Sequence, residues 1–365
     1  KMFDFDETLL ISLNSVDGLY SNKQRELLEL FGGASALAEE FSSCRDVALK
    51  AVSPKLYDEI KQALDGGNIS RAVEKAVAGG VRVTTLFSDD YPAALRDIPE
   101  PPTVLYYKGD LKLLDKPSVS VVGSRKCSDY GRRVARYFTE RLAERLVIIS
   151  GMAYGIDETA HKTALDCGGE TVAVMGSGFS RIYPSGHKWL CDRIAEQGLV
   201  LTEFPPDAPP NQFHFPMRNR IISGLSDGVL IVEAGRKSGT QTTLNHALDQ
   251  GKRVYIVPND IFSQCSVGSN EMLKNLQGAL VTSPEDILAD MGLDRAERQS
   301  AHQLTFGEQS VADKLAYGKK HFNQLLEETK LAVSELQYIL SDMEIKGLLI
   351  RLAGNEYQLT MEGIK

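Results

Sequence analysis

The chain has 365 residues, of which 42% are hydrophobic and 25% are charged. This length predicts two or three domains, and the composition excludes a disordered or fibrous protein. The net charge of −8 excludes a surface coated uniformly with positive charge, although it permits a local basic groove.

Residues 1–80 form the first region, in which the pattern is helical, glycine and proline interrupt it, and no strand-like run occurs. Within it, Arg25–Gly33 faintly resembles a helix-hairpin-helix or SAM-like unit. We therefore predict a small helical, SAM-like module. Its expected helices are Thr8–Leu13, Lys23–Phe31, Ala34–Phe41, Cys44–Ala51, Pro54–Leu64 and Ile69–Ala78.

Residues 81–290 form the second region, where short β-branched runs alternate with helical segments. This alternation predicts a Rossmann-like α/β domain, a parallel sheet with helices on both faces. The expected strands are Val83–Phe87, Val104–Tyr107, Val119–Val122, Val147–Ile149, Thr171–Met175, Val200–Phe204, Val229–Glu233, Arg253–Val257 and Ala279–Thr282. The expected helices include Gly131–Arg145, Asp157–Cys167, His187–Gln197 and Thr240–Gln250.

Residues 291–310 are polar and lose periodicity, so we interpret them as a linker. Residues 311–365 then predict two helices followed by a two-stranded wing, which is the winged-helix pattern. The helices are His321–Thr329 and Ala332–Gly347, and the strands are Leu348–Leu352 and Glu356–Leu359.

Four glycine-rich segments follow predicted strands, and two of them carry basic residues. Ligands of open parallel sheets bind beyond the carboxyl ends of the strands, so these segments would share one rim. Glycine lets backbone N–H groups approach an anion, and a following helix N-terminus adds positive potential. Tight packing explains one such turn, but four favour a phosphate-binding edge. The segments are Gly123–Arg125, Ser150–Asp157, Gly176–Gly178 and Ala234–Thr240.

Familiar nucleotide and catalytic motifs do not fit this rim. Gly176–Arg181 lacks the third glycine of a dinucleotide fingerprint, and the sequence contains no P-loop motif. Gly224–Gly228 matches a nucleophile pattern but precedes a strand, so we interpret it as a helix-ending turn. We therefore expect no cofactor and no metal. Four histidines without ligand spacing are expected to be structural: His161, His187, His214 and His246.

Phe213–Ser226 places aromatic residues beside two arginines. Single-stranded nucleic acids are bound in this way, because bases stack on aromatic faces while guanidinium groups meet phosphates. An alternative stays open, in which the phenylalanines are core residues. In that case Arg218 and Arg220 would pair with local acids such as Glu203 or Glu233.

The cysteines are odd in number and scattered, without metal or redox spacing, which indicates reduced thiols. The N-terminal segment Lys1–Glu7 lacks the features of a signal peptide, and no apolar run reaches the roughly 18 residues of a membrane span. We expect a cytoplasmic protein that does not associate with membranes. The cysteines are Cys44, Cys127, Cys167, Cys191 and Cys265.

Several of these segments, in this order and over roughly residues 80–290, together resemble the signature of the DNA-processing protein A (DprA/Smf) family. They are Gly123–Arg125, Ser150–His161, Tyr183–Pro184, Phe215–Ser226, Val232–Ala234 and Lys237–Gly239.

The resemblance implies a non-catalytic homodimer that binds single-stranded DNA in a pocket of its Rossmann-like domain. It also implies loading of the RecA recombinase during natural transformation, with displacement of single-strand-binding protein. Carried over by position, the implied DNA-binding residues are Gly123, Ser124, Arg125, Ser150, Gly151, Gly155, Phe215, Arg218, Asn219, Lys237 and Ser238.

The chain departs from the family pattern in three places. Asn211 and Gln212 stand where some relatives have a basic residue, which puts one phosphate contact in doubt. Tyr154 occupies a position that is often arginine, and Asn259 follows Val257-Pro258 in place of the usual glycine.

Two other functions compete with this interpretation. A phosphoribohydrolase-like enzyme would need a Pro-Gly-Gly-x-Gly-Thr-x-x-Glu loop, but Ala234–Thr243 lacks the double glycine and the glutamate. A sequence-specific regulator would use Ala332–Gly347 as its recognition helix. The charged residues of that helix are mostly acidic, so the helix fits the negatively charged phosphate backbone poorly.

Overall fold

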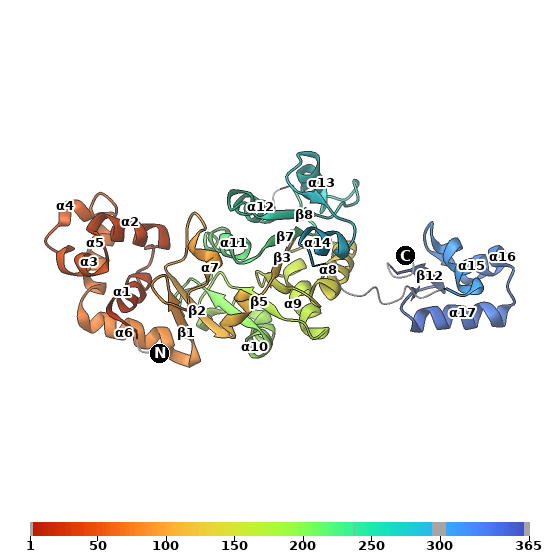
Figure 1. Ribbon diagram of the computed structural model, residues 1–365, viewed down its shortest axis with the longest axis horizontal. Coiled ribbons are helices and arrows are strands. Elements are labelled where there is room, and N and C mark those ends of the chain that lie inside the picture. Colours follow the sequence, from red (N-terminus) through yellow and green to blue (C-terminus); the bar gives the residue numbers. More distant parts are fainter. Residues whose placement is uncertain (1–2, 237, 294–303, 361–365) are drawn as a thin grey trace. The chain divides into compact units, whose positions relative to one another are not determined.

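The computed structural model describes residues 3–236, 238–293 and 304–360, and Figure 1 shows the chain coloured along its sequence. The chain divides into two compact units, Lys1–Asp294 and Arg295–Lys365. Within the described ranges, no helix combines the length and apolar character that crossing a bilayer requires.

The first region is helical, as predicted. Its first helix starts at a capping box, in which Asp4 accepts from the backbone N–H of Glu7 and the Glu7 carboxylate accepts in return. The second ends at Gly32, whose φ of 80° is the left-handed conformation that glycine adopts without strain. The helices are α1 (Phe5–Asn14), α2 (Ser21–Phe31), α3 (Ala34–Glu40), α4 (Arg45–Ala48), α5 (Pro54–Ala63) and α6 (Gly66–Val77).

A mostly parallel sheet forms the centre of the first unit, which confirms the predicted Rossmann-like fold class. Its strand order is β1-β2-β6-β5-β4-β3-β7-β8-β9, in which β2 pairs antiparallel with both β1 and β6. The strands are β1 (Arg82–Thr85), β2 (Val104–Gly109), β3 (Ser118–Val122), β4 (Val147–Ser150), β5 (Thr171–Val174), β6 (Leu199–Thr202), β7 (Gly228–Ile231), β8 (Arg253–Ile256) and β9 (Ala279–Leu280).

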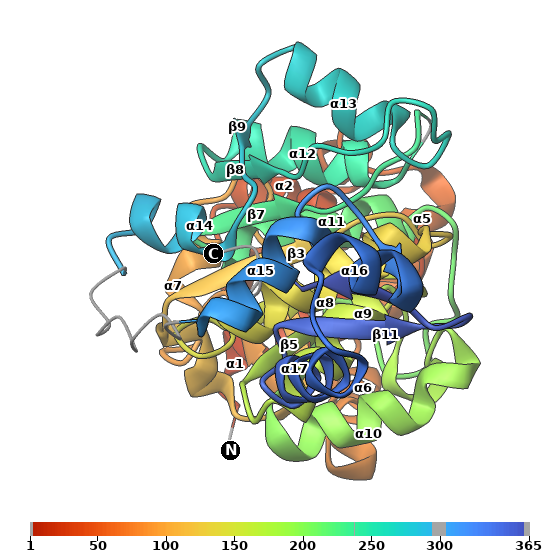
Figure 2. The same ribbon diagram turned by 90° about the vertical axis from the view of Figure 1, so that its right-hand side faces the viewer.

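Helices cover both faces of this sheet, because successive strand residues point to opposite sides. Val121 of β3 joins the core under α8, α9 and α14, whereas Val122 joins the core under α7, α11, α12 and α13. Figures 1 and 2 show α12 and α13 on one side of the sheet and α10 on the other. The bounds are α7 (Ala93–Arg96), α8 (Asp129–Leu142), α9 (Ile156–Asp166), α10 (Lys188–Gln197), α11 (His214–Leu225), α12 (Thr240–Asp249), α13 (Val267–Lys274) and α14 (Pro284–Asp290).

The helical region shares its core with the edge of the sheet. Val83 of β1 and Tyr106 of β2 lie in the same hydrophobic cluster as residues of α1, α2, α3 and α5. In addition, the Tyr106 hydroxyl donates to Asn14 Oδ1 at 2.9 Å, and Asn14 Nδ2 donates to the backbone oxygen of Glu203 at 3.3 Å. The α1–α6 region therefore belongs to the same compact unit as the sheet.

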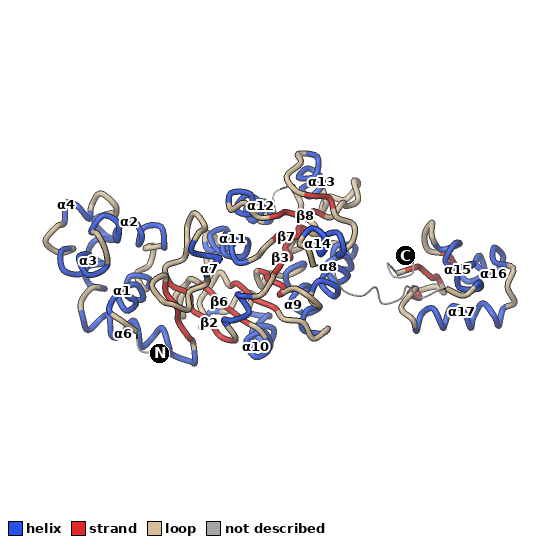
Figure 3. The backbone as a smooth tube through the Cα atoms, in the orientation of Figure 1, coloured by secondary structure: helices blue, strands red, loops and turns tan. Residues whose placement is uncertain are grey.

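The second unit has the winged-helix pattern that the sequence predicts, with a small sheet in the order β10-β12-β11. It also contains α15, which starts inside the segment that we interpreted as a linker up to residue 310. A capping box between Thr305 and Glu308 starts this helix, and Glu308 also pairs with Lys346. The elements, visible in Figure 3, are α15 (Phe306–Leu315), β10 (Lys320–His321), α16 (Phe322–Thr329), α17 (Val333–Ile345), β11 (Leu349–Leu352) and β12 (Glu356–Leu359).

Candidate nucleic-acid interface

A hollow lies where β3, β4 and β5 end, next to the start of α11. Chain order runs from β3 through β4, β5 and β6 in one direction, and β7 then pairs on the other side of β3. Such a reversal is where open α/β sheets bind ligands. We call this space the rim hollow; its lining residues are Arg125, Gly151, Ala153, Tyr154, Tyr183, Pro184, Phe215 and Arg218.

Arg125 and Phe215 lie side by side in the lining of the rim hollow. The Arg125 guanidinium lies 5.0 Å from the centre of the Phe215 ring, and it makes no ion pair with a carboxylate in the described part of the chain. The ring is half-buried and packs over Gly176, where an added Cβ would lie 2.8 Å from Phe215 Cδ1. An accessible cation therefore stands beside an accessible aromatic face.

Arg218 lies deeper and is only 3% exposed. Its Nη1 donates to the backbone oxygens of Gly151, at 2.5 Å, and Val174, and its Nε donates to Asn219 Oδ1 at 3.1 Å. Burial lowers its pKa to about 10, and the nearby carboxylate of Asp157 opposes that shift. The guanidinium thus joins the ends of β4 and β5 and supports the floor of the hollow.

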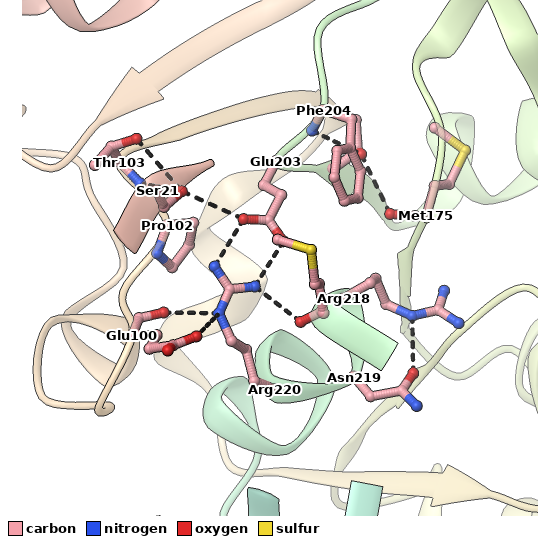
Figure 4. Close-up of polar contacts among 12 residues, drawn as sticks. Ser21, Glu100, Pro102, Thr103, Met175, Glu203, Phe204, Arg218, Asn219 and Arg220 are labelled. Carbon is pink, nitrogen blue, oxygen red and sulfur yellow. Dashed lines mark hydrogen bonds and ion pairs between the residues drawn. The ribbon is translucent and has the colours of Figure 1, made fainter. Parts of the chain in front are cut away.

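Arg220, two residues further along α11, points away from the rim. It makes a two-point ion pair with Glu203, with Nη1–Oε1 at 2.6 Å and Nη2–Oε2 at 2.7 Å, and both residues are buried. Ser21 also donates to Glu203, at 3.4 Å, so the pair connects α11 to the helical region (Figure 4). Pairing with a local acid is therefore confirmed for Arg220.

Glycines shape the loop that carries Arg125. Gly155 has a φ of 84°, and an added Cβ would lie 2.4 Å from the Ser124 backbone oxygen. At Gly123 an added Cβ would lie 2.6 Å from Ile156 Cγ1, while the Ser124 N–H donates to the Glu233 backbone oxygen at 2.8 Å. These contacts hold the loop between β7 and the start of α9.

One predicted site residue, Ser150, and one neighbouring carboxylate, Glu233, serve the fold. The Ser150 hydroxyl is buried and donates to the backbone oxygen of Val121 at 2.7 Å, which joins β4 to β3. At the start of α8, the buried Glu233 carboxylate accepts from the N–H and the hydroxyl of Ser128. The chain's own carboxylate thus occupies the helix N-terminus that we expected to face phosphate.

Asn219 and Ser238 lie at the fourth glycine-rich turn. Asn219 Nδ2 donates to the backbone oxygen of Gly239 at 3.3 Å, and Ser238 Oγ accepts from the Thr240 N–H at 3.2 Å. The predicted Lys237 lies outside the described residues. The structure therefore brings Arg125, Gly151, Phe215 and Arg218 into one hollow. It places Ser238 on a neighbouring turn, which Asn219 of α11 contacts.

Two tyrosines that were not among the predicted DNA-binding residues also line the rim hollow. Tyr154 is 48% exposed and Tyr183 is 42% exposed, and the Tyr183 ring lies 5.4 Å from that of Phe215. Tyr154 lies inside the glycine-rich segment Ser150–Asp157, and Tyr183 follows the segment Gly176–Gly178. An aromatic residue at or just after such a turn was the available signal in the sequence. They give the hollow aromatic walls on more than one side.

The histidines that we interpreted as structural are mostly enclosed. Tyr154 packs on His187 with the ring centres 4.6 Å apart, and His187 contacts the Met152 backbone oxygen. His161 is fully buried, and burial lowers its pKa to about 3, so it is neutral near pH 7. Among the described residues, no group of three or more His, Cys, Asp or Glu is placed to hold a metal ion.

The serine of the nucleophile-like Gly224–Gly228 pattern lies between the end of α11 and the start of β7. The Ser226 hydroxyl is buried and donates to the backbone oxygen of Ser223 at 3.2 Å. The pattern is thus a helix-ending turn, as predicted.

Comparison with known sequences gives consistent matches. A family model described as DNA recombination-mediator protein A matches residues 82–292, and one described as the DprA winged helix domain matches residues 295–355. The DNA processing protein DprA of Streptococcus pneumoniae is 39% identical over 252 residues, which cover 69% of this chain and 84% of that protein. Protein Smf of Escherichia coli is 45% identical over 207 residues, 56% of this chain and 55% of Smf.

Solved structures agree with these matches. The X-ray structure of DNA processing protein A from S. pneumoniae aligns with a TM-score of 0.70 at 34% identity, covering 79% of this chain and 99% of that one. A Helicobacter pylori DNA processing protein A, studied for its single-stranded DNA binding mode, aligns with a TM-score of 0.53 at 31% identity. This alignment covers 58% of this chain and 97% of that one. The chain therefore belongs to the DprA/Smf family of DNA recombination-mediator proteins.

Proposed function

We propose that this protein is a single-stranded-DNA-binding recombination mediator that binds its DNA at the rim hollow. The observation that carries the proposal is the exposed Arg125 guanidinium 5.0 Å from the Phe215 ring, with no carboxylate partner among the described residues. A base can stack on such a ring while the cation meets a phosphate. The H. pylori relative, studied for its single-stranded DNA binding, supports this assignment.

The neighbouring groups suit a flexible single strand better than a duplex. Tyr154 and Tyr183 offer further aromatic surface, which a base can reach only when it is unpaired. Arg218, held by the backbone oxygens of Gly151 and Val174, contributes positive potential from below. Its role is to fix the hollow's floor, so DNA contact falls mainly to Arg125 and Phe215.

The wider role follows from family membership. We infer that the protein is a non-catalytic cytoplasmic homodimer that protects incoming single strands and loads RecA during natural transformation. The non-catalytic assignment is supported by Ser150 and Asp157, polar groups next to the hollow that are buried and hydrogen-bonded within the fold. Co-precipitation with RecA on DNA coated with single-strand-binding protein tests the loading role.

The deciding experiment measures fluorescence anisotropy of labelled oligo-dT with wild type and Arg125→Ala, at two salt concentrations. Loss of the cation should weaken binding roughly tenfold and reduce the salt slope by about 0.7, the value for one single-strand phosphate contact. Arg141→Ala is the matched control, because Arg141 is a partly exposed arginine near the C-terminal end of α8. Absence of binding by wild type at low salt would refute the proposal and direct attention to nucleotide-hydrolase assays.

A further inference from the structure

A second, larger hollow lies between the helical region and the sheet. Its volume is about 360 Å³, and one wall comes from the end of α6 and the residues before β1. The opposite wall comes from the segments that follow β5 and β6, and Lys108 of β2 lies between them. We call it the junction hollow; the lining residues that matter for its chemistry are Lys75, Lys108, Phe179, Ser180 and Asp207.

The junction hollow repeats the chemistry of the rim hollow. Lys108 Nζ lies 5.5 Å from the centre of the Phe179 ring, just as Arg125 lies 5.0 Å from Phe215. Phe179 is half-buried, so part of its ring stays accessible. A cation beside an open aromatic face is again the arrangement that binds an unpaired base and its phosphate.

The charge of the junction hollow also favours an anion. Lys75 is exposed, and neither Lys75 nor Lys108 forms an ion pair with a carboxylate in the described part of the chain. Asp207 is the acidic residue in the lining, so the lining residues carry a net positive charge. Lys116 and Lys188, by contrast, each have a carboxylate oxygen within 2.7 Å.

A short stretch of chain connects the two hollows. Gly176 lies under the Phe215 ring of the rim hollow, and Phe179 follows three residues later. Three residues span at most about 11 Å, so a strand leaving Phe215 reaches Phe179 within a few nucleotides. The connection is held in place, because Gly178 donates to the Ala208 backbone oxygen at 2.9 Å and Ser180 donates to that of Pro206 at 2.8 Å.

We propose that the junction hollow is a second subsite for the same single strand, with a base on Phe179 and phosphates on Lys108 and Lys75. This inference rests on the proposed function of the rim hollow. The helical region would then contribute a DNA contact of its own through Lys75 of α6. The bound strand would be longer than the rim hollow alone can hold.

The test compares oligo-dT of about 2 and about 20 nucleotides. The shorter strand cannot occupy both hollows, and the two lengths bracket the site sizes of single-strand-binding folds. Phe179→Leu keeps apolar volume but removes the aromatic face, and Lys75→Glu reverses an exposed charge without touching the core. Each variant should weaken binding of the long strand at least fivefold, by loss of stacking or of a phosphate contact, and leave the short strand unchanged. Lys112→Glu is the charge-matched control, since exposed Lys112 does not line the hollow.

The outcomes separate this inference from the proposed function. If both variants bind the long strand like wild type while Arg125→Ala weakens both lengths, the second subsite is refuted and the rim site stands. Equal loss for short and long strands would also refute it, because the effect would then act on the rim hollow. If wild type binds neither length, the proposed function fails first.

Discussion

Arg125 of the rim hollow lies against Phe215 of α11, and Arg220 belongs to α11, but the fold holds these two arginines in opposite ways. Arg220 is 4% exposed and makes a two-point ion pair with Glu203, which is 3% exposed. Arg125 is exposed and rests on an aromatic ring, with no carboxylate partner in the described ranges. The difference separates a charge that builds the fold from a charge left free for a ligand. It also predicts that mutations at the two places affect different measurements.

The largest expected effect is on stability, from Glu203→Ala. Removing this carboxylate leaves the buried Arg220 charge with only the exposed Glu100 carboxylate, 4.0 Å away, which should lower the free energy of unfolding by about 3–5 kcal/mol. Chemical denaturation monitored by circular dichroism measures it. Asp166→Ala, which breaks the more exposed pair with Arg193, should cost less than about 1 kcal/mol. Similar losses in the two variants would contradict the distinction between the two arginines.

Phe215→Ala should affect DNA affinity next most strongly. The variant loses the face on which a base stacks, at a cost of about 1–3 kcal/mol of binding free energy. Anisotropy with oligo-dT measures the change. Phe213→Ala is the control, because Phe213 is 64% exposed two residues away and does not line the rim hollow. Equal weakening by both substitutions would show that the hollow is not the determinant.

Arg125→Ala should affect DNA binding and leave stability nearly unchanged, whereas Glu203→Ala should affect stability. Because Arg125 is exposed and has no ion-pair partner among the described residues, the free energy of unfolding should stay within about 0.5 kcal/mol of wild type. Binding should nevertheless fall, as described above. Denaturation and anisotropy on one preparation check both statements, and a destabilised variant would mean that Arg125 supports the fold.

The smallest expected effect is a gain in DNA affinity, from Gln212→Lys. Gln212 is exposed and stands where some relatives have a basic residue. Gln212→Lys should add one phosphate contact, raising affinity a few-fold at low salt and steepening the salt slope by about 0.7. Gln212→Leu is the uncharged control. An unchanged salt slope in the lysine variant would place this position away from the bound strand.

Local pattern was enough to predict most of the architecture. Strands such as β3 and β5 are short apolar runs bounded by turns, and their predicted bounds differ from the observed ones by about one residue. The sequence also carried a signal for α14, since Ser283 and Asp286 form a capping box with Pro284 at the first helical position. The helices that we predict from the sequence nevertheless do not include α14.

Helices α13 and α15 depended on tertiary structure. Each contains glycine and polar residues that weaken the helical pattern. Their stability comes from distant partners, as when Met272 packs into the sheet core and Glu308 pairs with Lys346. Contacts of this kind join residues far apart in the chain, so local periodicity does not reveal them.

By itself, the sequence determined the residue types on the rim, its glycine-rich turns and its family. Only the tertiary structure decided what each arginine does. Arg218 and Arg220 are near neighbours in the chain, yet the backbone oxygens of Gly151 and Val174 hold one, and the carboxylate of Glu203 holds the other. The physical reason is that a charge is free or engaged according to its burial and its partners, and the fold brings those partners from distant strands.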